Sequence, residues 1–322
     1  MLKNYKPIVV VAGEPYSVFL EILFNSLKKN RFKKPIILIV SKNLLIKQMK
    51  SLKYNFKINL LNEKNLSFKS DRNVINIINV NFLFKKTFDK ISNKSNTYIN
   101  NSFKIALKLL KNHKCSGLIN GPISKKNFLN SNYLGITEFL AEKSKRKNKV
   151  AMLIYNKKLS VSPITTHLPL KEVHKNITKT KIINHIELIR NFYKIILKKN
   201  PKIAVTGLNP HCESNYKSSE EDKIIRPAIK NLTQKKYNIK GPFPADTIFM
   251  KENLKKYDVI IGMYHDQVLT PIKTLYGFDA INITIGLPFI RISPDHGPNE
   301  KMLGKNLSDP KSLIEALKFL DK

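Results

Sequence analysis

Short apolar runs alternate with longer amphipathic segments along most of the 322-residue chain. The apolar runs predict strands, which we place at residues 8–12, 36–40, 74–78, 115–119, 150–155, 159–165, 202–206, 259–263 and 280–285. The amphipathic segments predict helices, which we place at residues 17–28, 97–112, 180–198, 220–231 and 310–320. We expect Asp309 to cap the last helix and Pro310 to be its first residue, where a missing N–H costs nothing. This alternation is typical of an α/β fold with a largely parallel sheet covered by helices.

The bulk composition indicates a soluble protein with ample core. The chain is 42% hydrophobic, which suffices for one large or two medium domains. No apolar run approaches the roughly 20 residues that a membrane-spanning helix needs, so we expect no membrane segment. The run near the N-terminus predicts a first strand rather than a signal peptide. The only cysteines, Cys115 and Cys212, argue against a disulfide framework, and we expect a cytoplasmic protein.

The formal net charge of +35 raises the question of nucleic-acid binding. The lysines are scattered through every segment, whereas a nucleic-acid site usually gathers basic residues into a stripe with interleaved aromatic residues. We therefore predict a solvated basic surface that attracts anionic substrates, and no nucleic-acid partner.

Three histidines stand just beyond the carboxyl ends of predicted strands, namely His167, His211 and His265. In a parallel sheet these ends share one edge, where α/β proteins build their binding sites. Taken singly, each histidine is better explained as a polar loop residue with one hydrogen bond. Taken together, three neutral imidazoles favour a binding site for a divalent metal ion, with zinc, cobalt or another transition ion preferred over magnesium.

The remaining histidines differ in their surroundings. His113, His174 and His185 lie in lysine-rich sequence and are expected at the surface. His296 either lines the binding crevice or holds its loop. Cys212, beside His211, is either a fourth soft ligand or a small packing side chain.

A second group of residues is suited to binding anions. Lys273, Asn282 and Arg291 follow or flank the last predicted strands. Lysine offers a compact charge and arginine a bidentate fork for phosphate or carboxylate. Lys273 can also be explained as an ordinary surface charge. This explanation fits Arg291 less well, because its neighbours in the sequence are apolar. Residues 121–125 (GPISK) could present backbone N–H groups and a lysine to an anion at a helix start.

Several short segments occur in a characteristic order along the chain: residues 120–125 (NGPISK), 135–141 (GITEFLA), 165–170 (TTHLPL), 207–211 (GLNPH), 241–247 (GPFPADT), 264–267 (YHDQ), 286–291 (GLPFIR) and 295–297 (DHG). With these segments the chain resembles the 4-hydroxythreonine-4-phosphate dehydrogenase (PdxA) family over most of its length. Their number and order, more than any single motif, make the resemblance specific.

The resemblance implies two α/β/α domains like those of isocitrate and isopropylmalate dehydrogenases, with mostly parallel sheets and a cleft between the domains. We expect the first domain over residues 1–130 plus 295–322. The second domain, with the metal ligands and the dimer interface, is expected over residues 131–294. The resemblance also implies a homodimer with its active sites at the subunit interface.

The resemblance assigns roles residue by residue. The implied metal ligands are His167, His211 and His265. The implied substrate-binding residues are Thr137, Lys273, Asn282 and Arg291. The residues expected at the cofactor, NAD or NADP, are Gly207, Asn209 and Asp246. The catalytic candidates are Lys273, Asp266 and Asp246, and the sequence does not decide whether Lys273 or Asp266 moves the protons.

The implied reaction is an NAD(P)-dependent oxidation of 4-phosphooxy-L-threonine, assisted by zinc, cobalt or magnesium. The resulting β-keto acid would decarboxylate to 3-amino-2-oxopropyl phosphate, in the biosynthesis of pyridoxal 5'-phosphate (vitamin B6). The alternatives are a sister dehydrogenase of a phosphorylated sugar acid, 4-phosphoerythronate or 4-phosphothreonate, and a non-catalytic metal-binding relative.

The chain departs from the family pattern at three places. The glycine-rich first loop of the family reads GEPYSVFLE at residues 13–21, and the loop at residues 212–221 (CESNYKSSEE) also lacks the expected glycines. Ile136 replaces the family histidine that precedes the substrate-binding threonine. We expect altered backbone contacts to the cofactor phosphates and one fewer hydrogen-bond donor to the substrate.

Overall fold

The computed structural model describes residues 5–69, 71–112, 115–129, 133, 135–212, 219–277, 279–294 and 297–322. The chain forms two compact units, which we call unit 1 (Met1–Leu140 with Pro288–Lys322) and unit 2 (Ala141–Leu287). The sequence placed the corresponding boundaries after residues 130 and 294. That unit 2 carries a dimer interface stays a prediction.

Unit 1 is built on a parallel sheet. Its strands, in spatial order, are β3 (Lys57–Leu60), β4 (Val74–Asn79), β2 (Ile36–Val40), β1 (Ile8–Val11), β5 (Gly117–Asn120) and β12 (Arg291–Pro294). Every neighbouring pair in this series runs parallel. The central strands are buried on both faces, as expected for a parallel sheet covered by helices.

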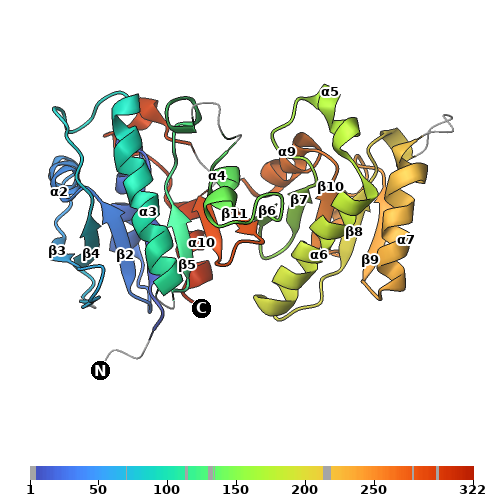
Figure 1. Cartoon of the computed structure of the whole chain (residues 1–322), viewed down its shortest axis with the longest axis horizontal. Helices are drawn as coiled ribbons and strands as arrows, with labels where there is room; N and C mark the ends of the chain where they lie inside the picture. The colour runs from blue at the N-terminus through green and yellow to red at the C-terminus, as the bar shows by residue number, and fades with distance from the viewer. Residues whose placement is uncertain are drawn as a thin grey trace. The chain divides into compact units, whose positions relative to one another are not determined.

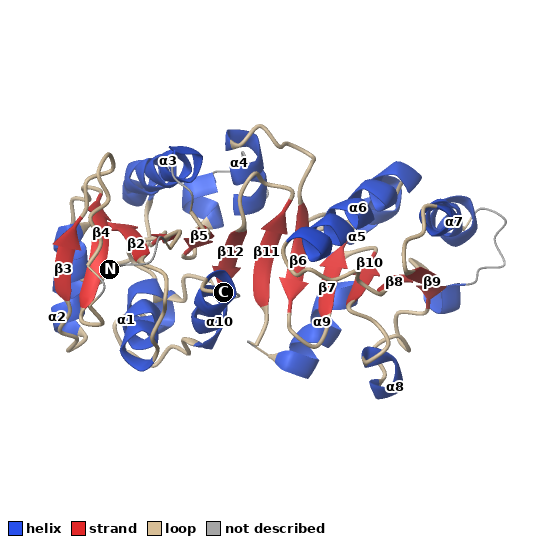
Figure 2. Ribbon diagram, turned by 90° about the horizontal axis from the view of Figure 1, so that it is seen from below, coloured by secondary structure: helices blue, strands red, loops and turns tan. Residues whose placement is uncertain are grey.

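Helices cover both faces of the unit 1 sheet (Figure 2). Helix α3 (Asn96–Asn112) packs on one face, while α1 (Phe19–Lys29) and α10 (Lys311–Leu320) pack on the other. Unit 1 also contains α2 (Lys42–Ser51). Helix α4 (Ile136–Lys143) begins near the end of the first segment of unit 1, Met1–Leu140. Helix α10 starts one residue later than expected, and the Asp309 carboxylate accepts a 2.9 Å hydrogen bond from the Lys311 N–H.

Unit 2 contains a mixed sheet. Its strands, in spatial order, are β11 (Ile281–Ile285), β6 (Ala151–Tyr155), β7 (Ser160–Pro163), β10 (Val259–Gly262), β8 (Ile203–Thr206) and β9 (Ile239–Phe243). Strand β6 runs antiparallel to both of its neighbours, and the series from β7 to β9 is parallel. The carboxyl ends of β7, β10 and β8 therefore share one edge.

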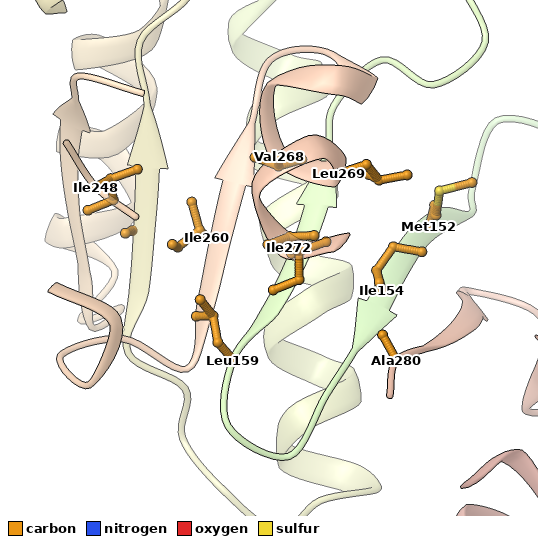
Figure 3. Close-up of a cluster of buried hydrophobic side chains, with 11 residues drawn as sticks. Met152, Ile154, Leu159, Ile248, Ile260, Val268, Leu269, Ile272 and Ala280 are labelled. Atoms are coloured by element: carbon orange, nitrogen blue, oxygen red, sulfur yellow. The ribbon is translucent and has the colours of Figure 1, made fainter. Parts of the chain in front are cut away.

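Helices also cover both faces of the unit 2 sheet. Helices α6 (Lys179–Ile195) and α7 (Arg226–Gln234) lie on one face and α9 (His265–Tyr276) on the other (Figures 1 and 2). Two short helices, α5 (Leu170–Val173) and α8 (Lys251–Leu254), lie in its loops. Val268, Leu269 and Ile272 of α9 pack into a buried apolar cluster with side chains of β6, β7, β8 and β10, part of which is labelled in Figure 3. This packing fixes α9 against the strands whose ends carry the histidines.

Every strand and helix predicted from the sequence is present, with ends shifted by a few residues. The patterns missed β3, β9 and β12, because polar residues, glycine or proline interrupt their apolar runs. They also missed α9, which contains Pro271, and the helices α2, α4, α5 and α8. No described helix combines the length and apolar character that a membrane span requires.

Candidate active site

The three predicted metal-binding histidines follow neighbouring parallel strands of unit 2. His167 comes after β7, His265 is the first residue of α9 after β10, and His211 lies in the turn after β8. Because β10 lies between β7 and β8, all three loops leave the same edge of the sheet. The predicted convergence at strand ends is therefore present at the level of the backbone.

His167 and His265 lie side by side. Their ring centroids are 5.9 Å apart with an interplanar angle of 38°. The backbone brings them together, since Thr165 donates to the Met263 carbonyl from both its N–H (3.1 Å) and its hydroxyl (2.7 Å). Each of these anchors lies two residues before one of the histidines.

The geometry of this pair fits a shared divalent ion. A ligand nitrogen lies about 2 Å from zinc, so two imidazoles on one ion have ring centroids about 5–6 Å apart. The Nδ1 atom of His265 is 2.6 Å from a carboxylate oxygen of Asp266, which leaves Nε2 for a ligand. A carboxylate behind a ligating imidazole is the usual means of fixing its tautomer.

His211 occupies a strained turn. It belongs to the turn Pro210–Cys212, is exposed, and has a left-handed backbone with φ of 59°. Among the residues that the structure describes, no three His, Cys, Asp or Glu side chains lie close enough together to hold a metal ion. The three-histidine site therefore stays a prediction, of which the single chain brings two members together.

Cys212 behaves as a packing side chain. It is buried, and burial raises the pKa of its thiol above the usual value. A Cβ added at Gly207 would lie 2.6 Å from its Sγ, so the thiol fills the space beside that glycine. This arrangement supports the second of the two roles that the sequence left open.

The predicted cofactor residues lie on neighbouring loops. The Gly207 N–H donates to the Phe243 carbonyl at 3.0 Å, which joins the loop after β8 to the loop after β9. Asp246 is exposed in the latter loop, and its charge contributes to the raised pKa of Cys212. The amide of Asn209 donates to Glu220 (2.9 Å) and Glu221 (2.8 Å).

Glu221 organises the same loop and was not expected from the sequence. Its carboxylate accepts hydrogen bonds from the backbone N–H groups of Leu208 (2.7 Å) and Asn209 (2.9 Å). Burial by itself would raise the pKa of Glu221, but the bonds from Asn209 and the backbone outweigh it and lower the pKa. The signal in the sequence is a run of acidic residues, 220–222, in a chain that has few of them.

The two substrate-binding candidates of unit 2 occupy different settings. Lys273 is exposed on α9, about 12 Å along the helix axis from His265, rather than at a strand end. Asn282 lies half-buried on β11, and its Oδ1 atom is buried without a hydrogen-bond partner. A buried acceptor without a partner is uncommon in folded proteins and marks Asn282 as a candidate for a polar contact with a ligand.

One of the two substrate-binding candidates of unit 1 is a buried cation. Arg291 is only 1% exposed, as its apolar neighbours predicted, and its Nε donates to Asn120 Oδ1 at 2.7 Å. Burial lowers the pKa of Arg291 to about 10, while the charge of Glu138 acts in the opposite direction. Thr137 is half-buried on α4, next to Glu138.

The surface prediction for His185 is wrong. This side chain is 7% exposed on α6, and its Nε2 lies 2.7 Å from the Ser162 hydroxyl on β7. Burial, with a smaller effect of the Lys181 charge, lowers the pKa of His185 to about 4. The lysines around it in the sequence concealed its apolar spacing with Ile182 and Ile189. His174 is exposed as predicted, whereas His113 and His296 lie outside the described residues.

A buried acid in unit 1 was also missed. Glu14, directly after the first strand, is 2% exposed, and its Oε1 has no hydrogen-bond partner. Burial raises the pKa of Glu14 to about 7, although a hydrogen bond from Ser95 opposes the shift. An acid directly after a buried strand in a basic chain was the available signal.

Comparisons with known proteins identify the family. A family model described as pyridoxal phosphate biosynthetic protein PdxA matches residues 31–320. A relative from Sulfurihydrogenibium sp., named 4-hydroxythreonine-4-phosphate dehydrogenase, is 45% identical over 226 residues, which are 69% of this chain and 68% of that protein. A crystal structure of 4-hydroxythreonine-4-phosphate dehydrogenase from Klebsiella pneumoniae has a TM-score of 0.84 at 27% identity, covering 98% of both chains.

A more distant structure bears on the fold alone. Isocitrate dehydrogenase from Methylococcus capsulatus has a TM-score of 0.50 at 8% identity, covering 96% of this chain and 83% of that chain. The predicted isocitrate dehydrogenase-like α/β fold is therefore confirmed. With the family model matching most of the sequence, the chain belongs to the PdxA family of pyridoxal phosphate biosynthetic proteins.

Proposed function

We propose that the chain is a 4-hydroxythreonine-4-phosphate dehydrogenase that uses NAD or NADP and a divalent metal. It would oxidise 4-phosphooxy-L-threonine to a β-keto acid, which decarboxylates to 3-amino-2-oxopropyl phosphate. Within this family, the observation that carries the proposal is the placement of His167 and His265 at adjacent strand ends with their rings 5.9 Å apart. A homodimer with active sites at the subunit interface, in the cytoplasm, is part of the same proposal.

The metal would be held by His167, His265 and His211. A bound zinc, cobalt or magnesium ion would supply Lewis-acid polarisation of the substrate hydroxyl. Asp266 orients His265 through its 2.6 Å contact with Nδ1, so that Nε2 keeps its lone pair. The donor set of imidazoles favours zinc or cobalt over magnesium.

The nicotinamide cofactor would accept a hydride from the carbon that bears the hydroxyl. Gly207, Asn209 and Asp246, on the joined loops after β8 and β9, are its proposed binding residues. The oxidation also releases one proton, and Lys273 and Asp266 are the proposed groups that carry it away.

Arg291 and Asn282 would bind the anionic substrate, together with Thr137 and Lys273. At a pKa of about 10, the guanidinium of Arg291 stays charged at neutral pH. Its Nε donates to Asn120 at 2.7 Å, which fixes the orientation of the guanidinium, the group suited to a phosphate or carboxylate. The unpartnered Oδ1 of Asn282 supplies a polar contact of the kind that orients a ligand.

A second candidate substrate is a phosphorylated sugar acid without the amino group, such as 4-phosphoerythronate, or the related 4-phosphothreonate. The observation in its favour is Ile136, which begins α4 and places an apolar side chain next to Thr137. A site with one polar group fewer discriminates less strongly for the amino acid.

The direct test is formation of reduced nicotinamide by the purified protein. We expect wild-type protein to reduce NAD or NADP in the presence of 4-phosphooxy-L-threonine and a divalent metal, and His211→Ala to show no turnover. His174→Ala removes an exposed histidine of the same unit and should retain full activity. Cofactor reduction that is independent of metal, or unchanged in His211→Ala, would overturn the assignment, and faster turnover of a sugar acid would favour the second candidate.

A further inference from the structure

Unit 1 contains a cavity at the amino ends of β2 and β4, beside the end of α1. Its volume is about 280 Å³, close to the size range of small-molecule sites. The floor is apolar and includes the buried side chains of Leu23 from α1, Leu38 from β2 and Ile75 from β4. Asn120, the partner of Arg291, ends β5, so the cavity lies at the opposite edge of the parallel sheet from this substrate-binding candidate.

The rim of this cavity is strongly basic. Five cationic side chains and one acidic side chain line it, namely Arg31, Lys33, Lys34, Lys69, Arg72 and Asp71. The whole chain has 58 lysines and arginines against 23 aspartates and glutamates, so cations are enriched here even for so basic a protein. Two of the six arginines of the chain are among them. Their guanidinium groups match phosphate through paired hydrogen bonds.

Neighbouring carboxylates do not neutralise these cations. No ion pair among the described residues involves Arg31, Lys69 or Arg72. The carboxylate of Asp71 instead accepts a 2.9 Å hydrogen bond from the Asn73 N–H within its own turn. An anionic group at the rim would therefore meet several positive charges without having to displace an existing ion pair.

Hydrogen bonds hold the backbone on both sides of the cavity in place. On the side of β4, the amide of Asn76 accepts from the Lys69 N–H at 2.9 Å and donates to the Lys69 carbonyl at 3.1 Å. On the side of β2, the Asp321 carboxylate accepts from the N–H groups of Lys33 (3.1 Å) and Lys34 (2.8 Å). A cavity whose walls are already ordered loses less conformational entropy when a ligand binds.

We propose that this cavity binds a small organic phosphate, with its apolar ring or chain on the floor and its phosphate group at the rim. The floor offers hydrophobic burial that inorganic phosphate cannot use, and the rim offers charge that an uncharged ring cannot use. Both halves of the ligand are therefore needed for binding. The proposal concerns the amino edge of the unit 1 sheet and does not depend on the proposed dehydrogenase function.

The test is binding of phenyl phosphate to the purified full-length protein, measured by calorimetry at about 0.15 M salt so that long-range attraction is screened. We expect phenyl phosphate to bind, and inorganic phosphate and phenol each to bind at least about ten-fold more weakly, because each lacks one half of the ligand. Phenyl phosphate that does not bind, or that binds no more tightly than inorganic phosphate, would overturn the proposal.

Charge-removing variants separate the cavity from the net charge of the chain. Arg31→Met and Lys69→Met each remove one cation from the rim and should raise the Kd for phenyl phosphate by about three- to ten-fold. The matched controls are Lys29→Met and Lys64→Met, which remove the same charge from exposed positions that do not line the cavity. Their Kd should stay within about two-fold of wild type. An equal loss in all four variants would overturn the proposal.

A cavity-filling variant tests the apolar half of the site. Leu27 lines the cavity and is half-buried, so Leu27→Trp should occupy part of the space and weaken phenyl phosphate binding by at least about ten-fold. If this variant does not fold, the charge variants decide. Loss of binding in Lys273→Met, with no change in Lys69→Met, would place phenyl phosphate among the substrate-binding candidates. That result would overturn this proposal and leave the proposed function intact.

Discussion

Strand β7 has a histidine at its carboxyl end and another against its middle, and the two differ in their surroundings. His167 follows the strand, is half-buried, and lies beside the ring of His265. His185 contacts Ser162 within the strand, is almost fully buried, and has a pKa lowered to about 4. The same side chain is thus suited to ligand binding where it meets an open edge, and remains neutral where the sheet and α6 enclose it.

The hydrogen bonds explain why His185 cannot exchange its role with His167. The Ser162 hydroxyl donates to the Met152 carbonyl, so it accepts from the His185 Nε2–H. That bond fixes the neutral tautomer and links α6 to β6 and β7. His185 therefore contributes to stability, whereas His167 and His265 at the edge of the sheet are the proposed metal ligands.

The largest expected effect comes from removing a histidine at the carboxyl edge of the unit 2 sheet. We expect His265→Ala to raise the zinc Kd by more than about a hundred-fold, because a direct ligand matters more than the groups behind it. Its free energy of unfolding without metal should change by less than about 1 kcal/mol, since the residue is only half-buried at a helix start. Calorimetry and urea denaturation measure the two quantities. His185→Gln is the control, and its zinc Kd should equal that of wild type.

The next largest effect concerns pH. In the folded protein the pKa of His185 is lowered from 6.5 to about 4, so the neutral ring stabilises the fold fully above pH 6.5. As the pH falls from 6.5 to 4, the unfolded chain gains a proton that the folded chain refuses, and stability falls by up to about 3 kcal/mol. Urea denaturation of metal-free protein across this range should show a smaller fall in His185→Gln. An identical slope in the two proteins would contradict the buried neutral ring.

A smaller effect is expected from removing the His185 hydrogen bond at neutral pH. His185→Leu should lower the free energy of unfolding by about 1–3 kcal/mol, because the Ser162 hydroxyl loses a buried partner. The variant should keep its zinc affinity and its turnover once folded. Loss of zinc binding in folded protein would show that the interior and the edge of β7 are not independent.

The smallest expected effect comes from Asp266, which is largely exposed behind His265. Asp266→Asn should raise the zinc Kd by about ten-fold, because the ring loses a charged partner that holds its tautomer. Stability should stay within about 0.5 kcal/mol of wild type, as for other exposed changes. A zinc Kd equal to that of wild type would place Asp266 outside the metal-binding arrangement.

Local patterns predicted most of the regular structure for a simple reason. Strands such as β1 and β10 are buried on both faces and read as uninterrupted apolar runs, while α1 and α10 present one apolar side. The patterns did not predict strand β12, because its first residue is the charged and buried Arg291. They did not predict α9, because Pro271 interrupts its sequence. For Arg291, the hydrogen bond to Asn120 supports a charged residue in a buried position.

For the candidate site, the sequence by itself determined the family, the residue types, and the placement of three histidines after three strands. Only the tertiary structure decided that β7, β10 and β8 are neighbours, that His167 and His265 lie together, and that His185 is buried. It also assigned Gln267 and Glu221 their hydrogen bonds to the His211 loop. Strand order, and the burial of a polar side chain such as that of His185, depend on contacts between residues distant in the chain, which the local patterns did not show.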